Sequence, residues 1–183
     1  LGSTLVTCTA RDASGNTAQT TFAVNVRDTT APTLAQPSDV TVEQAARAGT
    51  VVTFSLPTAD DVCDAAPSVT CTPASGLTFP LGDTTVVCVA RDASGNESTT
   101  SFKVTVRDTA APTFDQPTDI VVEQSARDGT VVTFPAPTVQ DVCDAHPAVT
   151  FSPASGSRFQ LGATTVTCRV QDASGNFVEK TFK

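Results

Sequence analysis

The cysteines are the residues whose number and spacing most directly indicate chemistry in this chain. The 183-residue sequence contains six of them, and most recur with a period of 80 residues. They form two series and one single position: Cys8, Cys88 and Cys168; Cys63 and Cys143; and Cys71. Phe151 stands where a counterpart of Cys71 would fall. Regular spacing of this kind favours a disulfide framework, and with it an oxidising, extracellular compartment.

The repeat limits how these cysteines can pair. The last period holds only Cys143 and Cys168, so within that period they pair with each other or stay free. The equivalent residues one period earlier are Cys63 and Cys88. We therefore predict the disulfides Cys63–Cys88 and Cys143–Cys168. Each would close a loop of about 25 residues and contribute about 3.5 kcal/mol to stability in the chain-entropy account.

Two cysteines have no partner in this scheme. Cys8 belongs to a period whose first half is not in the sequence. Cys71 is predicted to be a buried free thiol that packs as a small apolar group, and the alternative is an intermolecular bridge. A zinc site built from Cys63, Cys71 and Cys88 is disfavoured, because the next period keeps only two of these positions and has no C-x-x-C motif.

Residues for acid–base or nucleophilic catalysis do not persist from one period to the next. His146 is the single histidine, and Ala66 occupies its position in the preceding period. The neighbouring carboxylates Asp60 and Asp61 become Gln140 and Asp141. Nucleophilic catalysis needs a base held within reach of a Ser or Cys. The sequence therefore predicts that the chain is not an enzyme and uses no organic cofactor.

Calcium is the one cofactor that the sequence leaves open. Asp28 and Asp108 stand where one period passes into the next, and calcium binds six to eight oxygen ligands. Four further residues could lie near them: Asp92, Asn96, Asp115 and Asp119. The alternative is that these carboxylates cap turns and start the connecting segments. We keep Asp28 and Asp108 as calcium candidates beside that structural interpretation.

The elements that must position these residues follow from the internal repeat. Residues 34–103 and 114–183 share 42 identities in 70 positions, and residues 1–33 and 81–113 share 22 in 33. This predicts a truncated repeat at 1–33, a complete repeat at 34–113 and a nearly complete one at 114–183. Because the sequence starts in the middle of a repeat, we expect it to be a window of a longer array.

Each repeat has the pattern of short strands. Alternation of apolar and polar residues predicts strands at residues 39–43, 50–56, 68–72, 77–79, 84–91 and 98–107, with 119–123 as the next copy of the first. The segment Asp92–Asn96 contains the Gly of a tight hairpin turn. Inward positions of the middle repeat would be Val52, Phe54, Leu56, Val86, Cys88, Ala90, Phe102, Val104 and Val106. The fold class predicted is all-β, with antiparallel sandwich repeats of 80 residues.

Composition excludes two classes of partner. The formal net charge is -8 and no basic cluster is present, which disfavours nucleic acid binding. No apolar run is long enough to span a bilayer, so no membrane insertion is predicted. Trp and Tyr are absent, and glycan-binding surfaces depend on exposed aromatic rings.

Five strings carry a resemblance to a known family. They are Asp61–Asp64 (DVCD), Val69–Gly76 (VTCTPASG), Phe79–Cys88 (FPLGDTTVVC), Ala90–Asn96 (ARDASGN) and Val104–Asp108 (VTVRD). Together they resemble the hyalin repeat, or HYR domain, over essentially the whole chain. The resemblance implies immunoglobulin-like sandwiches in tandem, an extracellular or cell-surface location, and a role in adhesion or matrix assembly. Members often carry a fourth Cys in the last strand, where this chain has Thr100 and Lys180, so a second disulfide involving Cys71 is not predicted.

These observations lead to one functional hypothesis and one alternative. The first is a non-catalytic structural and adhesive array that forms the shaft of a surface adhesin or the subunit of an extracellular filament. Its partners would be proteins, with neighbouring copies or repeats of itself the first choice. The alternative is an accessory module of a secreted enzyme that binds a glycan or a protein.

Overall fold

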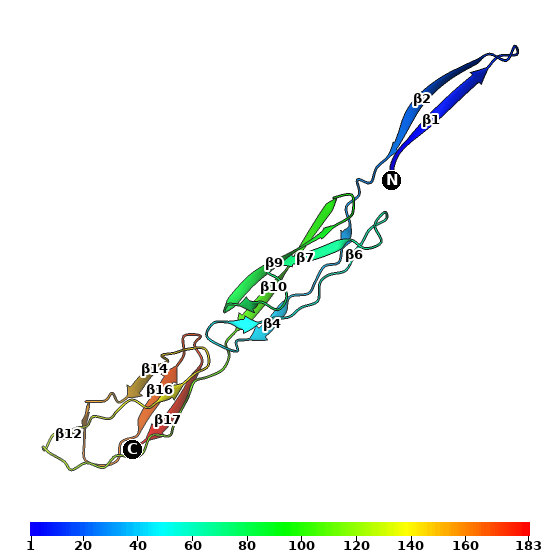
Figure 1. Cartoon of the computed structure of the whole chain (residues 1–183). Coiled ribbons are helices and arrows are strands. Elements are labelled where there is room, and N and C mark those ends of the chain that lie inside the picture. The colour runs from blue at the N-terminus through cyan, green and yellow to red at the C-terminus, as the bar shows by residue number, and fades with distance from the viewer. The chain divides into compact units, whose positions relative to one another are not determined.

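The computed structural model describes residues 1–183 and consists of strands, turns and loops without a helix (Figure 1). It therefore contains no helix with the length and apolar character of a membrane span. The strands are β1 (Gly2–Arg11), β2 (Thr17–Val26), β3 (Thr33–Leu34), β4 (Val40–Glu43), β5 (Thr50–Val51), β6 (Ala59–Asp60), β7 (Ser68–Thr72), β8 (Thr78–Phe79), β9 (Gly82–Arg91), β10 (Glu97–Arg107), β11 (Thr113–Phe114), β12 (Thr130–Val131), β13 (Val139–Gln140), β14 (Ala148–Ser152), β15 (Arg158–Phe159), β16 (Val166–Gln171) and β17 (Phe177–Phe182). The prediction of an all-β chain of tandem β-sandwich repeats is confirmed.

The longer strands pair as hairpins, mostly with their sequence neighbours. β1 and β2 form an antiparallel ribbon from Gly2↔Val26 to Arg11↔Thr17. In the second repeat one sheet has the order β4-β10-β9-β7, and in the third repeat one has the order β14-β16-β17. Four short antiparallel pairs complete the topology: β3 with β6, β5 with β8, β11 with β13, and β12 with β15. The pairing of β4 with β10 is parallel, an exception to the antiparallel prediction.

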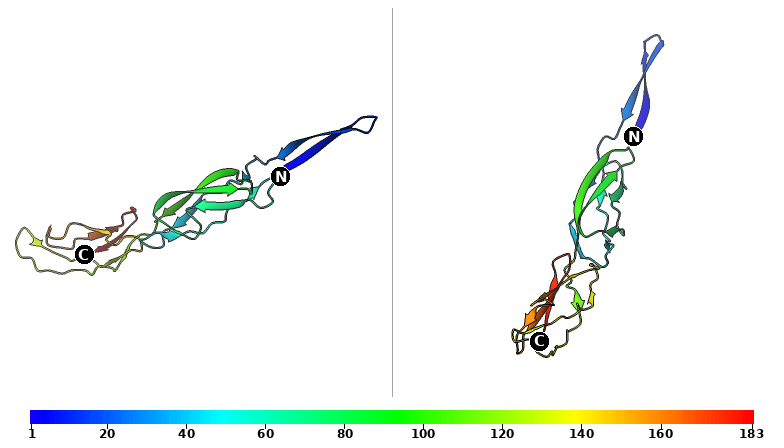
Figure 2. Two further views of the ribbon diagram at one scale, coloured as in Figure 1. Left: turned by 45° about the horizontal axis from the view of Figure 1, so that its top comes forward. Right: turned by 90° about the vertical axis from the view of Figure 1, so that its left-hand side faces the viewer.

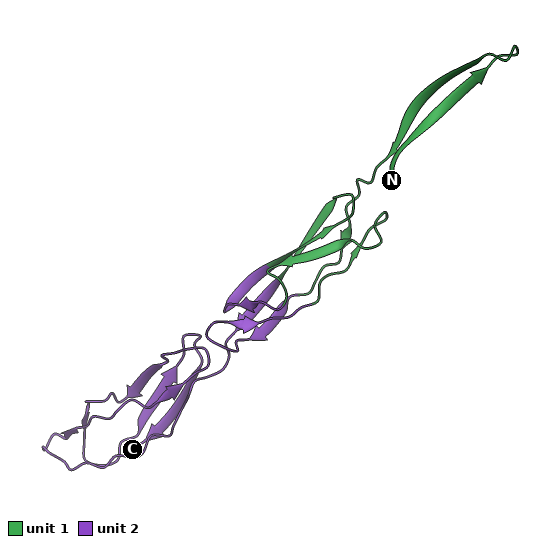
Figure 3. Cartoon of the chain, in the orientation of Figure 1, with its two compact units in different colours: residues 1–38, 55–75, 86–102 green, residues 39–54, 76–85, 103–183 purple.

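By contact density the chain divides into two compact units (Figure 3). The first contains residues 1–38, 55–75 and 86–102, and the second contains residues 39–54, 76–85 and 103–183. The sheet of the second repeat contributes strands to both units. The third repeat lies wholly in the second unit, and its sheet is drawn from two further directions in Figure 2.

The alternating pattern of β9 and β10 produces the predicted inward face. Val86, Cys88, Ala90 and Val104 are fully buried, and Val106 almost so. Successive strand residues point to opposite faces of a sheet, so every second residue enters the core. Burial of each Val stabilises the fold by about 1.5–3 kcal/mol relative to exposure.

The hairpin between β9 and β10 closes through the predicted Asp–Asn turn. The Asp92 carboxylate accepts hydrogen bonds from the Asn96 backbone N–H and from Asn96 Nδ2, each at 2.8 Å. Gly95 has a φ of 91°, which only glycine adopts without strain. Equivalent bonds join Asp12 to Asn16 and Asp172 to Asn176. These turns hold the two strands of each hairpin in register.

Two predictions about strands differ from the structure. The predicted strand 50–56 pairs only at Thr50–Val51, and Leu56 is 52% exposed although it was expected to point inward. Residues 119–123 form no strand, because their only ladder-like bond runs from the Ile120 N–H to the Lys183 carbonyl. In repeat one, Phe22, Val24 and Val26 are exposed, as expected for half of a sandwich, because nothing covers that face of the β1–β2 ribbon.

Candidate functional site

One disulfide is present, and it is not either of the two predicted. Cys71 on β7 is bonded to Cys88 on β9, with an S–S distance of 2.02 Å. The two residues are direct partners in the antiparallel ladder, and their Cα atoms are 4.0 Å apart. Directly opposed side chains meet across a strand pair. Cys63 lies in the loop after β6 and has a free thiol, so the predicted Cys63–Cys88 bridge is wrong, and Cys71 is not a free thiol.

The predicted Cys143–Cys168 bridge is also wrong. Cys168 is buried in β16, where Phe151 is its ladder partner, and it packs in a core cluster with Phe114 and Val170. Cys143 lies in the loop after β13, and its Sγ is 3.7 Å from the carbonyl oxygen of Gln44. Both thiols are free, as is that of Cys8 in the exposed ribbon. The predicted pairing takes both repeats to be alike, whereas the exchange of Cys71 for Phe151 makes the two repeats chemically different.

Two clusters of potential metal ligands occur instead, one per connecting segment. In the first, a carboxylate oxygen of Asp28, a carboxylate oxygen of Asp61 and the Sγ of Cys63 all lie within 4.8 Å of one another. In the second, Asp108, Asp141 and Cys143 repeat this arrangement 80 residues later. We call these the first and the second Asp–Asp–Cys cluster. Each lies within a single compact unit.

The strand pairs and turns beside each cluster hold its members in place. β3 pairs with β6 through Thr33↔Asp60, which brings the segment after Asp28 to the loop that starts at Asp61. Asp61 Oδ1 then accepts hydrogen bonds from the backbone N–H groups of Cys63 and Asp64, at 2.8 and 2.9 Å. In the second cluster, Asp141 Oδ1 accepts the corresponding bonds from Cys143 and Asp144. The DVCD strings are therefore turns closed by their first carboxylate.

The hairpin loops bind the same connecting segments. Asn96 Nδ2 is 3.4 Å from the carbonyl oxygen of Asp28, and Asn176 Nδ2 is 3.1 Å from that of Asp108. In the second case, Ser174 Oγ also donates to Asp108 Oδ2 at 2.8 Å. The connecting segments are thus held at their first residue by the Asp–Ala–Ser–Gly–Asn turn of the following repeat.

Burial and the nearby negative charge raise the pKa values of the two cluster thiols. Burial, followed by the nearby Asp108 and Asp141 carboxylates, raises the pKa of Cys143 to about 11. The pKa of Cys63 is raised for the same reasons, with desolvation first and then Asp28 and Asp61. Without a cation, both thiols are therefore protonated at neutral pH.

The calcium candidates Asp28 and Asp108 lie in these clusters, but their expected neighbours largely do not. Asp92 serves the hairpin turn, and Asp119 accepts a hydrogen bond from the Lys183 backbone at 2.8 Å. Of the four residues suggested near Asp28 and Asp108, Asn96 does lie close to Asp28, but its side chain donates a hydrogen bond to the Asp28 backbone carbonyl. Asp61 and Cys63 are the potential ligands beside Asp28 that the sequence alone does not predict. The recurrence of DVCD was the signal that could have found them.

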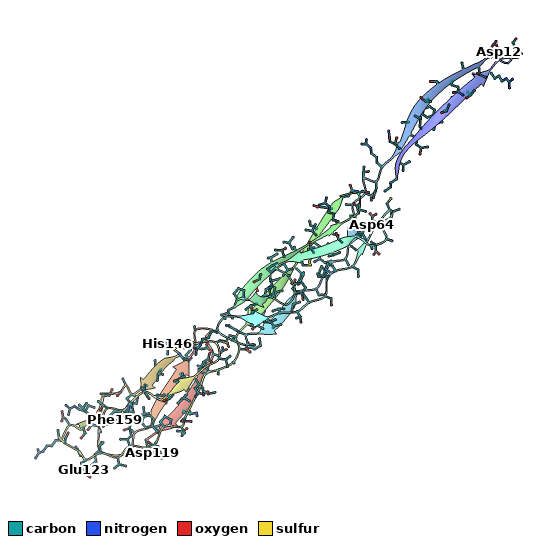
Figure 4. All side chains as sticks on the ribbon, in the orientation of Figure 1. Asp12, Asp64, Asp119, Glu123, His146 and Phe159 are labelled. Carbon is teal, nitrogen blue, oxygen red and sulfur yellow. A yellow bond between two sulfur atoms is a disulfide. The ribbon has the colours of Figure 1, made fainter.

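The single histidine lies in an exposed loop, and its hydrogen bond is made by the backbone. His146 is exposed in the loop after the second cluster, and its backbone N–H donates to Asp144 Oδ1 at 2.8 Å. Figure 4 shows His146 at one end of the third repeat, while Asp119, Glu123 and Phe159 lie toward the other. The imidazole of His146 forms no hydrogen bond to a cluster residue or to a nucleophilic side chain.

An apolar groove of about 340 Å³ lies at that other end. Its walls include Ile120, Val122, Phe159, Leu161 and Phe182. In the second repeat, the equivalent of the Ile120–Glu123 segment is β4, which pairs in parallel with Val104–Arg107 of β10. Ile120 and Val122 therefore line the groove in the third repeat, whereas their equivalents in the second repeat, Val40 and Val42, pair with β10.

Comparison with protein families and curated proteins gives consistent results. The HYR domain model matches residues 27–106 and again residues 107–183. Hyalin of Strongylocentrotus purpuratus is 37% identical over 187 residues, an alignment that covers 98% of this chain and 16% of hyalin. The serine-rich adhesin for platelets of Staphylococcus aureus (strain MRSA252) is 33% identical over 118 residues, covering 58% of this chain and 8% of the adhesin. The chain thus spans about a sixth or less of the length of these relatives.

Comparison with solved structures finds cadherin-type ectodomains. The crystal structure of protocadherin gamma C5 EC1-3 aligns with a TM-score of 0.41 and 17% sequence identity, covering 100% of this chain and 76% of the protocadherin.

Proposed function

The chain belongs to the HYR domain family, and from this premise we propose that it forms the shaft of a surface adhesin or the subunit of an extracellular filament. HYR domains and the hyalin and adhesin relatives are extracellular or cell-surface proteins, and so is this chain. In the proposal the repeats run as 1–33, 34–113 and 114–183. The matched HYR boundaries begin seven residues earlier, at residues 27 and 107.

The observation that carries the proposal is the repeated anchoring of the connecting segments. Asn96 binds the backbone carbonyl of Asp28, and one period later the equivalent Asn176 binds that of Asp108. Glu43 adds to the second segment, since its carboxylate accepts hydrogen bonds from the Thr109 backbone N–H at 2.6 Å and from Thr109 Oγ1 at 3.0 Å. A connecting segment held in this way resists bending more than a free linker does. That property suits a shaft.

The second repeat is also suited to bearing tension. In the parallel pairing of β4 with β10, backbone bonds join Val40–Glu43 to Val104–Arg107, near the two ends of the repeat in the sequence. Pulling the repeat apart by its ends loads these bonds. The Cys71–Cys88 bridge additionally prevents the 17-residue separation between the cysteines from extending.

A non-catalytic role agrees with the positions of the reactive residues. His146 is exposed and replaced by Ala66 in the preceding repeat, and Cys71 and Cys88 are consumed by the disulfide. The adhesive partners in this proposal are proteins, with other copies of the repeat as the first choice.

Single-molecule extension of the full chain tests the mechanical proposal. We expect a resolved unfolding event for the second repeat, at a force that an unstructured chain does not sustain. Reduction of the disulfide should lengthen that event by about 60 Å, because 17 residues at up to about 3.6 Å each are released. The Cys71→Ser variant should show the longer event without reductant, and Cys8→Ser should not. A smooth extension without unfolding events would contradict the shaft proposal.

Electron microscopy and light scattering distinguish the two versions. Concentration-dependent fibres of regular width support a filament subunit, whereas rods of constant length at all concentrations support a stalk. A saturable and specific hit on a glycan array would contradict both and favour the alternative of a ligand-binding accessory module.

A further inference from the structure

We propose that each Asp–Asp–Cys cluster binds one divalent cation of the zinc class. The ligands are the carboxylates of Asp28 and Asp61 with the thiolate of Cys63, and the equivalent groups of the second cluster. The inference concerns the chain's chemistry, goes beyond an adhesive role and does not depend on it. Two cations would bind per chain.

The first reason is that carboxylate oxygens at the first cluster lack any partner. Asp28 Oδ2 and Asp61 Oδ2 are both inaccessible to solvent, and neither accepts a hydrogen bond. Their Oδ1 atoms accept from the Thr30 N–H and from the Cys63 N–H, so the second oxygen of each carboxylate is left over. A buried polar atom without a partner is costly, and a buried carboxylate oxygen more so. The unpartnered oxygens belong to the residues whose ligand atoms converge in the first cluster.

The second reason is the burial of negative charge without a counter-ion. Asp108 is only 8% exposed, and none of the four ion pairs of the structure includes it or any other cluster member. Arg47 donates to the backbone carbonyls of Asp141 and Asp144 rather than to a carboxylate. Buried charges in proteins are paired or coordinate a metal, and two neighbouring carboxylates repel one another. A divalent cation would neutralise the buried charge and remove the repulsion between the two carboxylates.

The third reason is that the arrangement occurs twice. Residues 61 and 63 recur at 141 and 143, and Asp28 recurs as Asp108, with the same turn bonds in each copy. Of the 70 aligned positions in the second and third repeats, 28 do not recur identically. Stability alone does not require a Cys here, because neither thiol forms a disulfide or enters the apolar core.

The donor set selects the metal. Calcium and magnesium take oxygen ligands, and calcium takes six to eight of them. Two carboxylates and one thiolate suit zinc, which is bound tetrahedrally by sulfur, nitrogen and oxygen and accepts a water as fourth ligand. Cys63 is exposed, so a water can reach the fourth position of the first cluster.

The test uses the full chain with the Cys71–Cys88 bridge intact and the four other thiols reduced. Cobalt(II) serves as the spectroscopic probe, because thiolate coordination gives an intense near-ultraviolet charge-transfer band, and zinc is then titrated in competition. We expect two sites per chain, with zinc displacing cobalt. Cys63→Ser and Cys143→Ser should each remove about half of the charge-transfer signal. Asp28→Asn should weaken one site by about 10-fold or more.

The matched control is Cys8→Ser, which removes an exposed thiol that lies outside both clusters. It should leave both sites unchanged. Circular dichroism of each variant shows whether it is folded. A further measurement requires no variant: in the unmodified chain, zinc should slow the alkylation of Cys63 relative to that of Cys8. Three results would overturn the proposal: no binding at micromolar zinc or cobalt, equal loss of signal in Cys8→Ser, or calcium binding that persists undiminished in Cys63→Ser.

Discussion

Cys71 in the second repeat and Phe151 in the third occupy equivalent positions in β7 and β14, and each faces a cysteine across the ladder. In the second repeat the facing pair is a disulfide. In the third, Phe151 turns its ring to an aromatic cluster, with ring centroids 4.9 Å from Phe134 and 6.4 Å from Phe182. The same strand pairing is thus stabilised covalently in one repeat and by packing in the other.

This difference shows that the ladder register and the contents of the core are separately determined. Both pairs keep five ladder partners with the same offset, from Ser68↔Arg91 to Thr72↔Val87 and from Ala148↔Gln171 to Ser152↔Thr167. The alternating pattern alone sets that register. A domain of about 80 residues buries little apolar surface and needs additional stabilisation. The second repeat obtains it from a disulfide, and the third from packed aromatic rings.

The largest effect is expected where packing replaces the disulfide. Phe134→Ala should destabilise the third repeat by about 4 kcal/mol, since it leaves a cavity among Phe151, Phe159 and Phe182. Hydrogen exchange resolved by peptide mass spectrometry measures this, because the chain lacks Trp and Tyr for fluorescence. Protection should fall in β14–β17 and stay constant in β7. Equal loss in both repeats would show that they do not unfold independently.

The next effect concerns the disulfide. Cys71→Ser should cost the second repeat about 3 kcal/mol, the entropic contribution of a bridge with a 17-residue separation. Thermal unfolding followed by circular dichroism, with and without reductant, measures it. Reductant should have no further effect on the variant. Cys8→Ser is the control, and a comparable loss there would mean that the thiol chemistry, and not the bridge, sets stability.

A smaller net effect on stability is expected when a disulfide equivalent to that of the second repeat is introduced into the third repeat. Phe151→Cys should form a bridge with Cys168, because these positions are ladder partners as Cys71 and Cys88 are. The stabilisation by the bridge and the loss of aromatic contacts should nearly cancel, to within about 1–2 kcal/mol. Mass analysis after alkylation detects the bridge. Two alkylatable thiols at these positions would contradict the shared register.

The smallest effect is a pH-dependent one at the start of β9. Hydrogen bonds from Thr105 Oγ1 and Lys103 Nζ lower the pKa of Asp83, whereas the third repeat has Ala163 there. A lowered pKa means that the charged form stabilises the fold above the unfolded pKa, and that this contribution is lost as the pH falls through the folded pKa. Asp83→Asn should therefore lower the Tm slightly at neutral pH, and this difference should shrink as the pH falls below the unfolded pKa of 3.8. Melting curves across this range test it, and a difference that persists at low pH would argue for lost packing instead.

Much of the strand framework could be predicted from the sequence. The fully buried residues of β9 and the Asp–Asn hairpin turns follow from alternation and turn chemistry, which act between near neighbours. The short pairs β3 with β6 and β11 with β13 were missed, because two-residue strands carry no period. Residues 119–123 have strand pattern without strand structure, since a ladder needs a partner as well as a propensity.

The sequence by itself determined the 80-residue repeat, the all-β class and the inward face of each long strand, because these depend on local pattern and on identity at a fixed spacing. Only the tertiary structure decided which cysteines meet. It placed Cys71 opposite Cys88, and it brought Asp28 to the loop that holds Asp61 and Cys63. These are contacts between segments 17 or more residues apart, where distance in space is set by strand pairing and not by spacing along the chain. The repeat shows how many cysteines each period contains, but it does not determine which two lie close enough to form a disulfide.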